Sequence, residues 1–357
     1  MFDFVKKLSY YPEKLHIALS DEIGYSLSTV FLDLSTKQCN FDCIFCDSKF
    51  YNTTPLSFPK DVLFRIVEEL HSMRVESVLL CGDGAEPLLH PDFIEVASRL
   101  HSNGCNLGIY TNGSHYDNSI LNELKKFDFV RISLNAGTSK TYQRVHGINN
   151  EKQFANTLSF IKKVVRVNPN VGISFLIIED NINEMYSAAC LCKELGARFV
   201  EFKPAYRNDY SVNDFMYSKK DAIITEIRRC QLLATSSYSV VLNNQLSDFF
   251  DSPSQTNLTV LDTPRLCKVS KFRLVISPSG YYLCTPHRGK KEYRLGDPFQ
   301  DTIEQVWFGE RHKQLICKTC NLRCTYHAQN EFLLHLNTPD DIIMQDDLEN
   351  NTQKSFL

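Results

Sequence analysis

The chain has 357 residues, and its 39 basic and 42 acidic side chains leave a formal net charge of −3. This near balance gives no electrostatic reason to expect a nucleic-acid or membrane partner. The N-terminus lacks the apolar core of a secretory signal, and no stretch reaches the roughly 18 apolar residues of a membrane helix. We therefore expect a cytoplasmic globular protein with one large and one smaller domain, or two medium ones.

Short apolar runs alternate with amphipathic stretches through the first 205 residues. The expected strands are rich in Val, Ile, Leu and Phe, as buried parallel strands are; they cover 29–33, 77–81, 106–110, 129–133, 172–178 and 198–203. The expected helices cover 59–73, 91–101, 118–126, 151–165 and 182–195. A series of β-then-α units predicts an α/β fold with a parallel sheet and right-handed crossovers. A partial (β/α)6 TIM-like barrel and a doubly wound sheet both fit this pattern.

The alternation stops after residue 205. The following stretch contains one expected helix, 219–233, and then polar residues. Two further apolar runs, 272–277 and 281–285, flank Pro278-Ser279-Gly280, which predicts a β-hairpin. The domains we expect are a lead-in at 1–24, a core at 25–205, a helical linker at 206–258, a second domain at 259–336 and a polar, disordered tail at 337–357.

Thirteen cysteines in a chain of this kind favour metal binding over disulfides. Cys39, Cys43 and Cys46 follow the first expected strand with the spacing Cys-x3-Cys-x2-Cys. Three thiolates can hold three corners of an iron–sulfur cubane, for which proteins commonly supply four cysteines. With no fourth cysteine nearby, one iron would stay open for a ligand, as the open position of a catalytic metal does. A zinc knuckle is the alternative.

The segment CNFDCIFC resembles the CxxxCxxC loop of the radical S-adenosylmethionine (SAM) superfamily. The resemblance implies that SAM chelates the open iron of a [4Fe–4S] cluster through its amino and carboxylate groups. One electron then breaks a carbon–sulfur bond and gives a 5′-deoxyadenosyl radical, which takes hydrogen from the substrate. It also implies that Phe45 lies beside the adenine of SAM, and that a flavodoxin- or ferredoxin-like protein donates the electron.

A second motif lies where the second expected strand ends. Gly82-Asp83-Gly84-Ala85-Glu86-Pro87 resembles the Gly-Gly-Glu-Pro motif of the family, with Ala85 in place of the second glycine. The resemblance implies that Gly84 and Glu86 bind the SAM amino group, since glycine admits close approach and a carboxylate suits an ammonium. Cys81 closes the same strand; it is either a hydrogen donor to the substrate radical or a buried structural thiol.

Further motifs follow in the order found in the family. Thr111-Asn112-Gly113 resembles its TNG element, and Ser133-Leu134-Asn135 resembles the element that faces the ribose and carboxylate of SAM. These lie at expected strand ends, where the active residues of (β/α) barrels are found. The segment Tyr142-Gln143-Arg144-Val145-His146-Gly147 resembles one with an arginine before a glycine. Arg144 would then pair with the SAM carboxylate, or else be a surface arginine.

A second cysteine group lies in the expected second domain: Cys267, Cys284, Cys317, Cys320 and Cys324. With the hairpin and an amphipathic run, it resembles the SPASM or twitch extension of radical SAM enzymes, in which a β-hairpin and a helix hold auxiliary iron–sulfur clusters. The cysteines are fewer than two auxiliary clusters require, so the resemblance implies one auxiliary [4Fe–4S] cluster. The preferred ligands are Cys267, Cys284, Cys317 and Cys320, with Cys324 as the alternative to one of them. A structural zinc site fits the same count.

The superfamily resemblance implies the initiating step and leaves the substrate open. Only 38 residues precede Cys39, too few for a peptide-recognition domain. We therefore expect hydrogen abstraction from a small polar molecule, carbohydrate- or aminocyclitol-like, followed by oxidation, epimerisation or dehydration. A SPASM-type maturase that modifies a ribosomally made peptide is the second hypothesis, and a non-catalytic zinc-binding scaffold is the third.

Overall fold

The computed structural model describes residues 26–50, 54–205, 214–243, 260–322 and 326–335, together with His16, Ser20, Gly24, Leu246 and Cys324. The chain forms two compact units. Unit 1 comprises Met1–Gln38, Tyr51–Gly108 and Asp262–Leu357, and unit 2 comprises Cys39–Phe50 and Ile109–Leu261. The expected polar tail at 337–357 lies outside the described residues, as does the lead-in at 1–24 apart from His16, Ser20 and Gly24.

The strands of unit 1 combine segments from both ends of the chain. β1 (Thr29–Thr36) pairs in parallel with β3 (Ser77–Asp83) and with β10 (Arg273–Ser277). β10 turns back through the predicted hairpin into β11 (Gly280–Tyr282), and β12 (Arg294–Gly296) pairs with β11. The short β2 (Leu56–Ser57) pairs with the end of β1. The hairpin of the expected second domain thus extends the sheet that contains β1 and β3.

The helices of unit 1 follow the spacing of their apolar residues. α3 (Lys60–Ser72) buries Leu63, Ile66, Val67 and Leu70, which share one helical face, and contacts α4 (Phe93–Ser102). The amphipathic run after β12 forms two helices, α12 (Ile303–Trp307) and α13 (Glu310–Ile316), because Gly309 has an extended backbone between them. α14 (His327–His335) follows β13 (Thr319–Leu322), and β13 pairs with β9 (Val260–Leu266).

Unit 2 is a series of parallel strands. β4 (Asn106–Thr111) begins in unit 1 and ends in unit 2. In unit 2 the order is β5 (Phe129–Ser133), β6 (Val171–Ile177), β7 (Phe199–Pro204) and β8 (Ser239–Leu242). β8 was not expected: its alternating residues, in the segment predicted as a helical linker, pair with β7 and add one more β/α unit.

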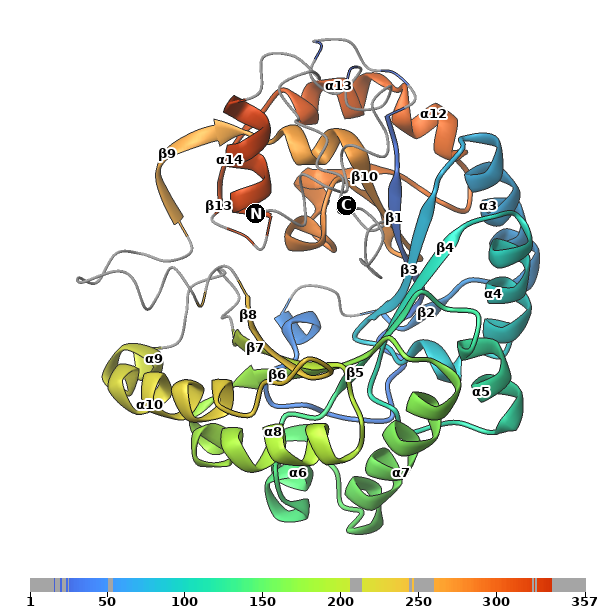
Figure 1. Ribbon diagram of the computed structural model, residues 1–357. Coiled ribbons are helices and arrows are strands. Elements are labelled where there is room, and N and C mark those ends of the chain that lie inside the picture. Colours follow the sequence, from blue (N-terminus) through green and yellow to red (C-terminus); the bar gives the residue numbers. More distant parts are fainter. Residues whose placement is uncertain are drawn as a thin grey trace. The chain divides into compact units, whose positions relative to one another are not determined.

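Helices cover one face of these strands (Figure 1). They are α5 (Asn118–Leu124), α6 (Ser139–His146), α7 (Lys152–Val167), α8 (Met185–Glu194), α9 (Asp214–Ser218) and α10 (Lys220–Gln231). Ile132, Ile173 and Val200 are fully buried, whereas their strand neighbours Ser133, Ser174 and Glu201 stay partly exposed. Since strand side chains alternate between faces, the polar residues lie on the face opposite the helices. We call this the polar face of unit 2.

The succession of parallel strands and helices in both units confirms the predicted α/β fold class. The strands expected before residue 205 are all present, with small shifts at their ends. Among the described residues, no helix has both the length and the apolar character needed to cross a bilayer.

Candidate active site

The loop with the first three cysteines belongs to unit 2 and follows β1 directly. Cys39 is exposed, and Cys43 and Cys46 are partly buried. Burial raises the pKa of the Cys43 thiol, and the neighbouring Cys39 and Cys46 thiols raise it further. Three thiols that oppose one another's ionisation become favourable ligands once a cationic group lies between them, because the cation offsets their repulsion.

His146, at the end of α6, fixes the middle cysteine. Its Nδ1 lies 3.1 Å from Cys43 Sγ, and its Nε2 lies 3.1 Å from the Leu134 carbonyl oxygen. Since a carbonyl only accepts, Nε2 carries the proton and Nδ1 accepts from the Cys43 thiol. Burial lowers the pKa of His146 to about 4, so the ring is neutral at pH 7. The sequence motif contained this residue, but nothing in its spacing pointed to Cys43.

The backbone of the cysteine loop is joined to the same helix end. Asp42 N donates to His146 O at 3.0 Å, and Ile44 N donates to Val145 O at 3.0 Å. Gly147 ends α6 with φ of +61°, and a Cβ atom there would lie 2.2 Å from Asp42 O. Glycine is therefore required here both for the left-handed backbone and for the close approach of the loop.

The predicted adenine neighbour, Phe45, lies edge-on to the His146 ring, with centroids 5.6 Å apart. It packs against a buried group made of Val145, Ile178 and Ala205. Phe45 therefore lies within unit 2 at the boundary between the cysteine loop and α6.

The end of β4 also contacts the cysteine loop. Asn112 Nδ2 donates to Asn40 Oδ1 at 3.1 Å and lies 3.6 Å from Cys39 Sγ. Thr111 is buried, and its hydroxyl accepts from Gly113 N at 3.0 Å, which fixes the turn after the strand. Asn112 is thus placed to orient Cys39, whereas the Thr111 hydroxyl stabilises the turn that follows β4.

The loop after β5 contains Asn135, whose side-chain amide nitrogen is buried without a hydrogen-bond partner among the described residues. Asn135 is 1% exposed, with an unusual φ of +55°. Its Oδ1 accepts from Leu176 N at 2.7 Å, but its buried Nδ2 has no hydrogen-bond partner among the described residues. Ser133, two residues earlier, lies on the polar face beside Ser174. A buried amide without an acceptor fits a bound polar molecule such as the carboxylate or ribose of SAM.

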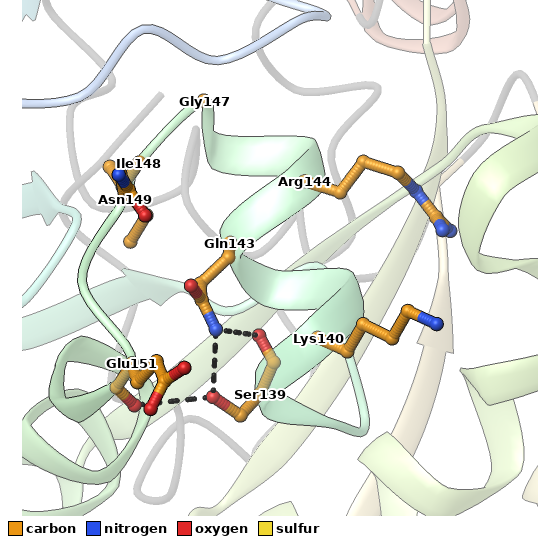
Figure 2. Close-up of a pocket in the computed structure, with 8 residues that line it drawn as sticks. All are labelled: Ser139, Lys140, Gln143, Arg144, Gly147, Ile148, Asn149 and Glu151. Carbon is orange, nitrogen blue, oxygen red and sulfur yellow. Dashed lines mark hydrogen bonds between the residues drawn. The ribbon is translucent and has the colours of Figure 1, made fainter.

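Arg144 lies on the surface of α6 rather than beside Ser133 and Asn135. Its Nε is 2.7 Å from Asp180 Oδ1, its Nη2 donates to Asp180 O at 2.9 Å, and the side chain is 49% exposed. Figure 2 shows Arg144 and Lys140 extending to one side of α6, near an open hollow, while Gln143 bonds to Ser139 on another side. Binding of a SAM carboxylate by Arg144 would require the pair with Asp180 to open.

The predicted SAM-amine motif belongs to unit 1. A Cβ atom at Gly82 would lie 2.2 Å from Ala85 O, and Gly84 has φ of +65°, so both glycines are needed for a tight turn. Glu86 is buried; its backbone N donates to Gln38 O at 3.1 Å. Its Oε1 accepts from Leu88 N at 3.2 Å and caps the short helix η2 (Pro87–Leu89). Glu86 thus has a structural contact within this turn.

Unit 1 also contains a buried charged cluster that the sequence did not reveal. Arg288 Nη1 donates to both carboxylate oxygens of Asp33 at 3.0 Å, and its Nε lies 3.7 Å from Asp83 Oδ1. The Cys81 thiol donates to Asp33 Oδ1 at 3.2 Å. Burial, and secondarily Asp33, raises the pKa of Cys81, so the thiol stays protonated at pH 7. The hydrogen bond to Asp33 favours the interpretation of Cys81 as a buried structural thiol over that of a hydrogen donor.

The second cysteine group surrounds a cavity of about 90 Å³ in unit 1. Four cysteines line it, together with Tyr293, Tyr326 and apolar residues: Cys267, Cys284, Cys320 and Cys324. Burial, together with the neighbouring thiols, raises the pKa of Cys324 to about 12 and that of Cys284 well above its usual value. Cys317, one of the preferred ligands from the sequence, is exposed at the end of α13 and does not line the cavity. The structure thus groups Cys324, rather than Cys317, with the other three.

Among the described residues, no three His, Cys, Asp or Glu side chains lie close enough together to hold one metal ion.

Comparisons with known proteins identify the family. Residues 34–189 match the family model of the radical SAM superfamily. An S-adenosylmethionine-dependent nucleotide dehydratase from Fibrobacter sp. (strain UWH6) is 27% identical over 290 residues, which cover 77% of this chain and 84% of that protein. A tungsten-containing aldehyde ferredoxin oxidoreductase cofactor-modifying protein from Pyrococcus furiosus is 21% identical over 168 residues. That alignment covers 45% of this chain and 47% of the relative, so the chain spans about half the length of this relative.

Solved structures share the fold. Streptococcus suis SuiB bound to S-adenosylmethionine superposes with a TM-score of 0.63 at 14% identity, over 90% of this chain and 77% of SuiB. The structure of anSMEcpe with bound AdoMet gives a TM-score of 0.58 at 15% identity, over 90% of this chain and 97% of that one. These similarities confirm the predicted fold. Residues 34–189 thus match a radical SAM domain and the chain resembles enzymes, and that family implies SAM and a [4Fe–4S] cluster as cofactors.

Proposed function

We propose that this enzyme takes a hydrogen atom from a small polar molecule, carbohydrate-like in size and polarity, and that oxidation, epimerisation or dehydration follows. The observation that carries the radical SAM step is the cysteine loop, whose middle thiol is held by His146 and whose backbone is joined to the end of α6. The Fibrobacter relative, named as a nucleotide dehydratase, supports a small-molecule substrate because its alignment covers most of both chains.

The cofactor sites follow from the contacts within each unit. Cys39, Cys43 and Cys46 would hold the SAM-cleaving cluster, with Asn112 orienting Cys39. When bound, that cluster supplies the electron that cleaves SAM. A larger set of residues would bind SAM or shape its site: Phe45, Gly84, Glu86, Thr111, Ser133, Asn135 and Arg144. Of these, Asn135 has the strongest support, because its buried Nδ2 lacks an acceptor.

We further propose one auxiliary [4Fe–4S] cluster, held by Cys267, Cys284, Cys320 and Cys324. The support is the cavity they line together with several apolar side chains, among them Leu283, Leu315 and Ile316. Four cysteines would occupy all four irons, so this cluster would act in electron transfer, for example as the acceptor in a substrate oxidation. A flavodoxin- or ferredoxin-like protein would supply electrons to the first cluster.

A ribosomally made peptide is the second candidate substrate. It is favoured by one observation: the chain shares its fold with SuiB solved together with its precursor peptide, at a TM-score of 0.61. At 13% identity this similarity concerns the fold alone, so the small-molecule proposal stands first.

Anaerobic reconstitution tests the proposal. The wild-type protein should bind about eight irons in two clusters and release 5′-deoxyadenosine from SAM when reduced with dithionite. Cys43→Ala should abolish this release because the first cluster loses its central ligand, whereas Cys284→Ala should spare part of it. Zinc in place of iron, or normal 5′-deoxyadenosine release by Cys43→Ala, would refute the assignment.

A further inference from the structure

A buried asparagine, Asn181, holds the loop that follows β5. It lies in the short helix η3 (Glu179–Glu184) and is fully buried. Its Nδ2 donates to Asn135 O at 2.9 Å and to Leu176 O at 2.8 Å. Its Oδ1 accepts from Ile178 N at 2.9 Å. Both N–H groups and the oxygen of this amide therefore bind backbone atoms, and they tie Asn135 to the end of β6.

The same contacts fix the side chain of Asn135. The two asparagines share Leu176: Asn135 Oδ1 accepts from its N–H at 2.7 Å, and Asn181 donates to its carbonyl. Because both the backbone carbonyl and the side-chain oxygen of Asn135 are bound, its Nδ2 is held in one place. This is the buried nitrogen that has no partner among the described residues. The contacts also offset the cost of the left-handed backbone at Asn135, where φ is +55°.

Glu184, the last residue of η3, holds the other end of the same loop. Its Oε2 accepts from Gly137 N at 2.7 Å and from Thr138 N at 3.0 Å, and its Oε1 accepts from Thr138 Oγ1 at 2.8 Å. A Cβ atom at Gly137 would lie 2.1 Å from Ser187 Oγ, so the loop packs closely against α8. The loop at 135–138 is thus bound from both ends, which restricts the orientations open to its side chains.

A buried asparagine at the opposite end of β6 illustrates a purely structural role. Asn168 is 1% exposed, and its Nδ2 donates to Leu124 O at 2.9 Å and to Phe127 O at 2.7 Å. Its Oδ1 accepts from Asn170 N at 2.8 Å. Asn168 and Asn181 therefore make the same kinds of hydrogen bonds. Of the two, Asn181 alone makes one of them to a proposed SAM residue.

We propose that Asn181 is a positioning residue for SAM, and that it sets the affinity for SAM by holding the Asn135 amide in its binding orientation. This inference rests on the proposed function, in which Asn135 binds SAM. In this arrangement the Asn135 Nδ2 donates to an oxygen of the SAM carboxylate or ribose, while Asn181 acts only through Asn135. A donor that is fixed in place loses little conformational entropy on binding, whereas a donor on a loosened loop loses more.

Calorimetric titration of SAM into the anaerobically reconstituted, full-length protein tests the proposal. Asn181→Ala should weaken SAM binding about tenfold or more, because the loosened loop no longer fixes the Asn135 amide. Its iron content should equal that of the wild type, since Asn181 lies outside the cysteine loop. Asn168→Ala is the matched control. It loses equivalent hydrogen bonds, so its urea midpoint should fall by a similar amount, but its SAM affinity should stay at the wild-type value.

A double-variant cycle measures whether Asn181 acts through Asn135. Asn135→Gly removes the side-chain amide but accepts the left-handed backbone, and it should also weaken SAM binding. Asn181→Ala should then add little to Asn135→Gly, because the group that it positions is already absent. Additive losses of SAM affinity would show that Asn181 acts by another route, and would overturn the proposal.

Two other outcomes also overturn it: a folded Asn181→Ala protein binds SAM as the wild type does, or Asn168→Ala loses SAM affinity equally. If Asn181→Ala gives no folded protein, Glu184→Gln decides, because this side chain is partly exposed and holds the same loop. A severalfold loss of SAM affinity in Glu184→Gln supports the proposal, and wild-type affinity refutes it. The proposed function fails separately. A wild-type protein that binds no SAM refutes the function itself, whereas unchanged SAM affinity in Asn181→Ala refutes only the positioning role.

Discussion

At the scale of single residues, the site depends on side chains whose partners are far away in the chain. His146 lies 103 positions from Cys43, and its protonated Nε2 is bound to the Leu134 carbonyl. The ring is neutral and hydrogen-bonded at both nitrogens, so it positions the Cys43 thiol; a Cys43 thiolate bound to iron would have no proton to donate to Nδ1. Position also distinguishes two candidate cluster ligands. Cys324 lines the cavity of the second cysteine group, whereas Cys317 is exposed.

These two cysteines make a matched pair of variants. Cys324→Ser should remove the auxiliary cluster, about four irons per chain, because serine is a poor replacement for a thiolate ligand in the cavity. Cys317→Ser should keep the full iron content, since Cys317 lies outside the cavity. Iron and sulfide analysis with electron paramagnetic resonance distinguishes the two variants. Equal iron loss in both would contradict the grouping seen in the structure.

His312 predicts a pH dependence of stability. It is fully buried, its Nδ1 donates to Trp307 O at 2.6 Å, and burial lowers its pKa to about 4. In the unfolded chain its pKa is about 6.5, so between pH 6.5 and 4 the unfolded state binds the extra proton and stability falls as the pH falls. The lost free energy of unfolding should approach about 3 kcal/mol at and below pH 4.

Urea unfolding of the protein at a series of pH values measures this effect. His312→Gln keeps a donor for Trp307 O but does not titrate, so its free energy of unfolding should fall less between pH 6.5 and 4 than that of the wild type. His101→Gln, at an exposed position of α4, is the control and should keep the wild-type slope. An unchanged slope in His312→Gln would show that other groups cause the pH dependence.

At the scale of elements, the end of α6 and the cysteine loop satisfy each other's backbone hydrogen-bonding groups. The last carbonyls of a helix have no partner within it. Here His146 O and Val145 O accept from Asp42 N and Ile44 N, so the loop satisfies the helix end while the helix fixes the loop. The left-handed Gly147 makes this approach possible.

Gly147→Ala tests the contact between the end of α6 and the cysteine loop. The added Cβ would both strain the left-handed backbone and collide with Asp42 O, so the loop must move. Gly104→Ala is the matched control, because Gly104 has φ of +84° but no atom within 4 Å of an added Cβ. Both should lose about 1 kcal/mol or more of stability from the backbone alone. Only Gly147→Ala should lose iron from the first cluster, as measured by iron content and 5′-deoxyadenosine release; equal iron retention in both would contradict the prediction.

At the scale of the whole molecule, unit 1 is assembled from segments that are far apart in sequence. β1 pairs with β10, and Arg288, which follows the proposed ligand Cys284, reaches Asp33 across 255 positions. The guanidinium and the two buried carboxylates therefore join the auxiliary-cluster segment to the strands that precede the cysteine loop and the Glu86 turn.

Arg288→Met should destabilise the protein by about 3–5 kcal/mol, because it leaves a buried carboxylate without its cation. Asp33→Asn combined with Arg288→Met should cost less than the sum of the single variants, since the directly paired Asp33 and Arg288 are then replaced together and only the Arg288 contact with Asp83 stays lost. Thermal and denaturant unfolding of the four proteins in this cycle give the coupling energy. Additive effects would show that the pair does not stabilise the fold.

Periodicity and short spacings predicted the β/α order, the family resemblance and the two cysteine groups, because these patterns are local properties of the chain. The folded chain was needed to show that β8 continues the parallel series, that β10 pairs with β1, that His146 contacts Cys43, and that Cys324 lines the cavity in place of Cys317. Folding also brings Arg131, Glu201 and Lys203 onto one face. Each of these depends on contacts between strands or loops separated by long stretches of chain, and such contacts are set by packing and register, which no local pattern of residue types specifies.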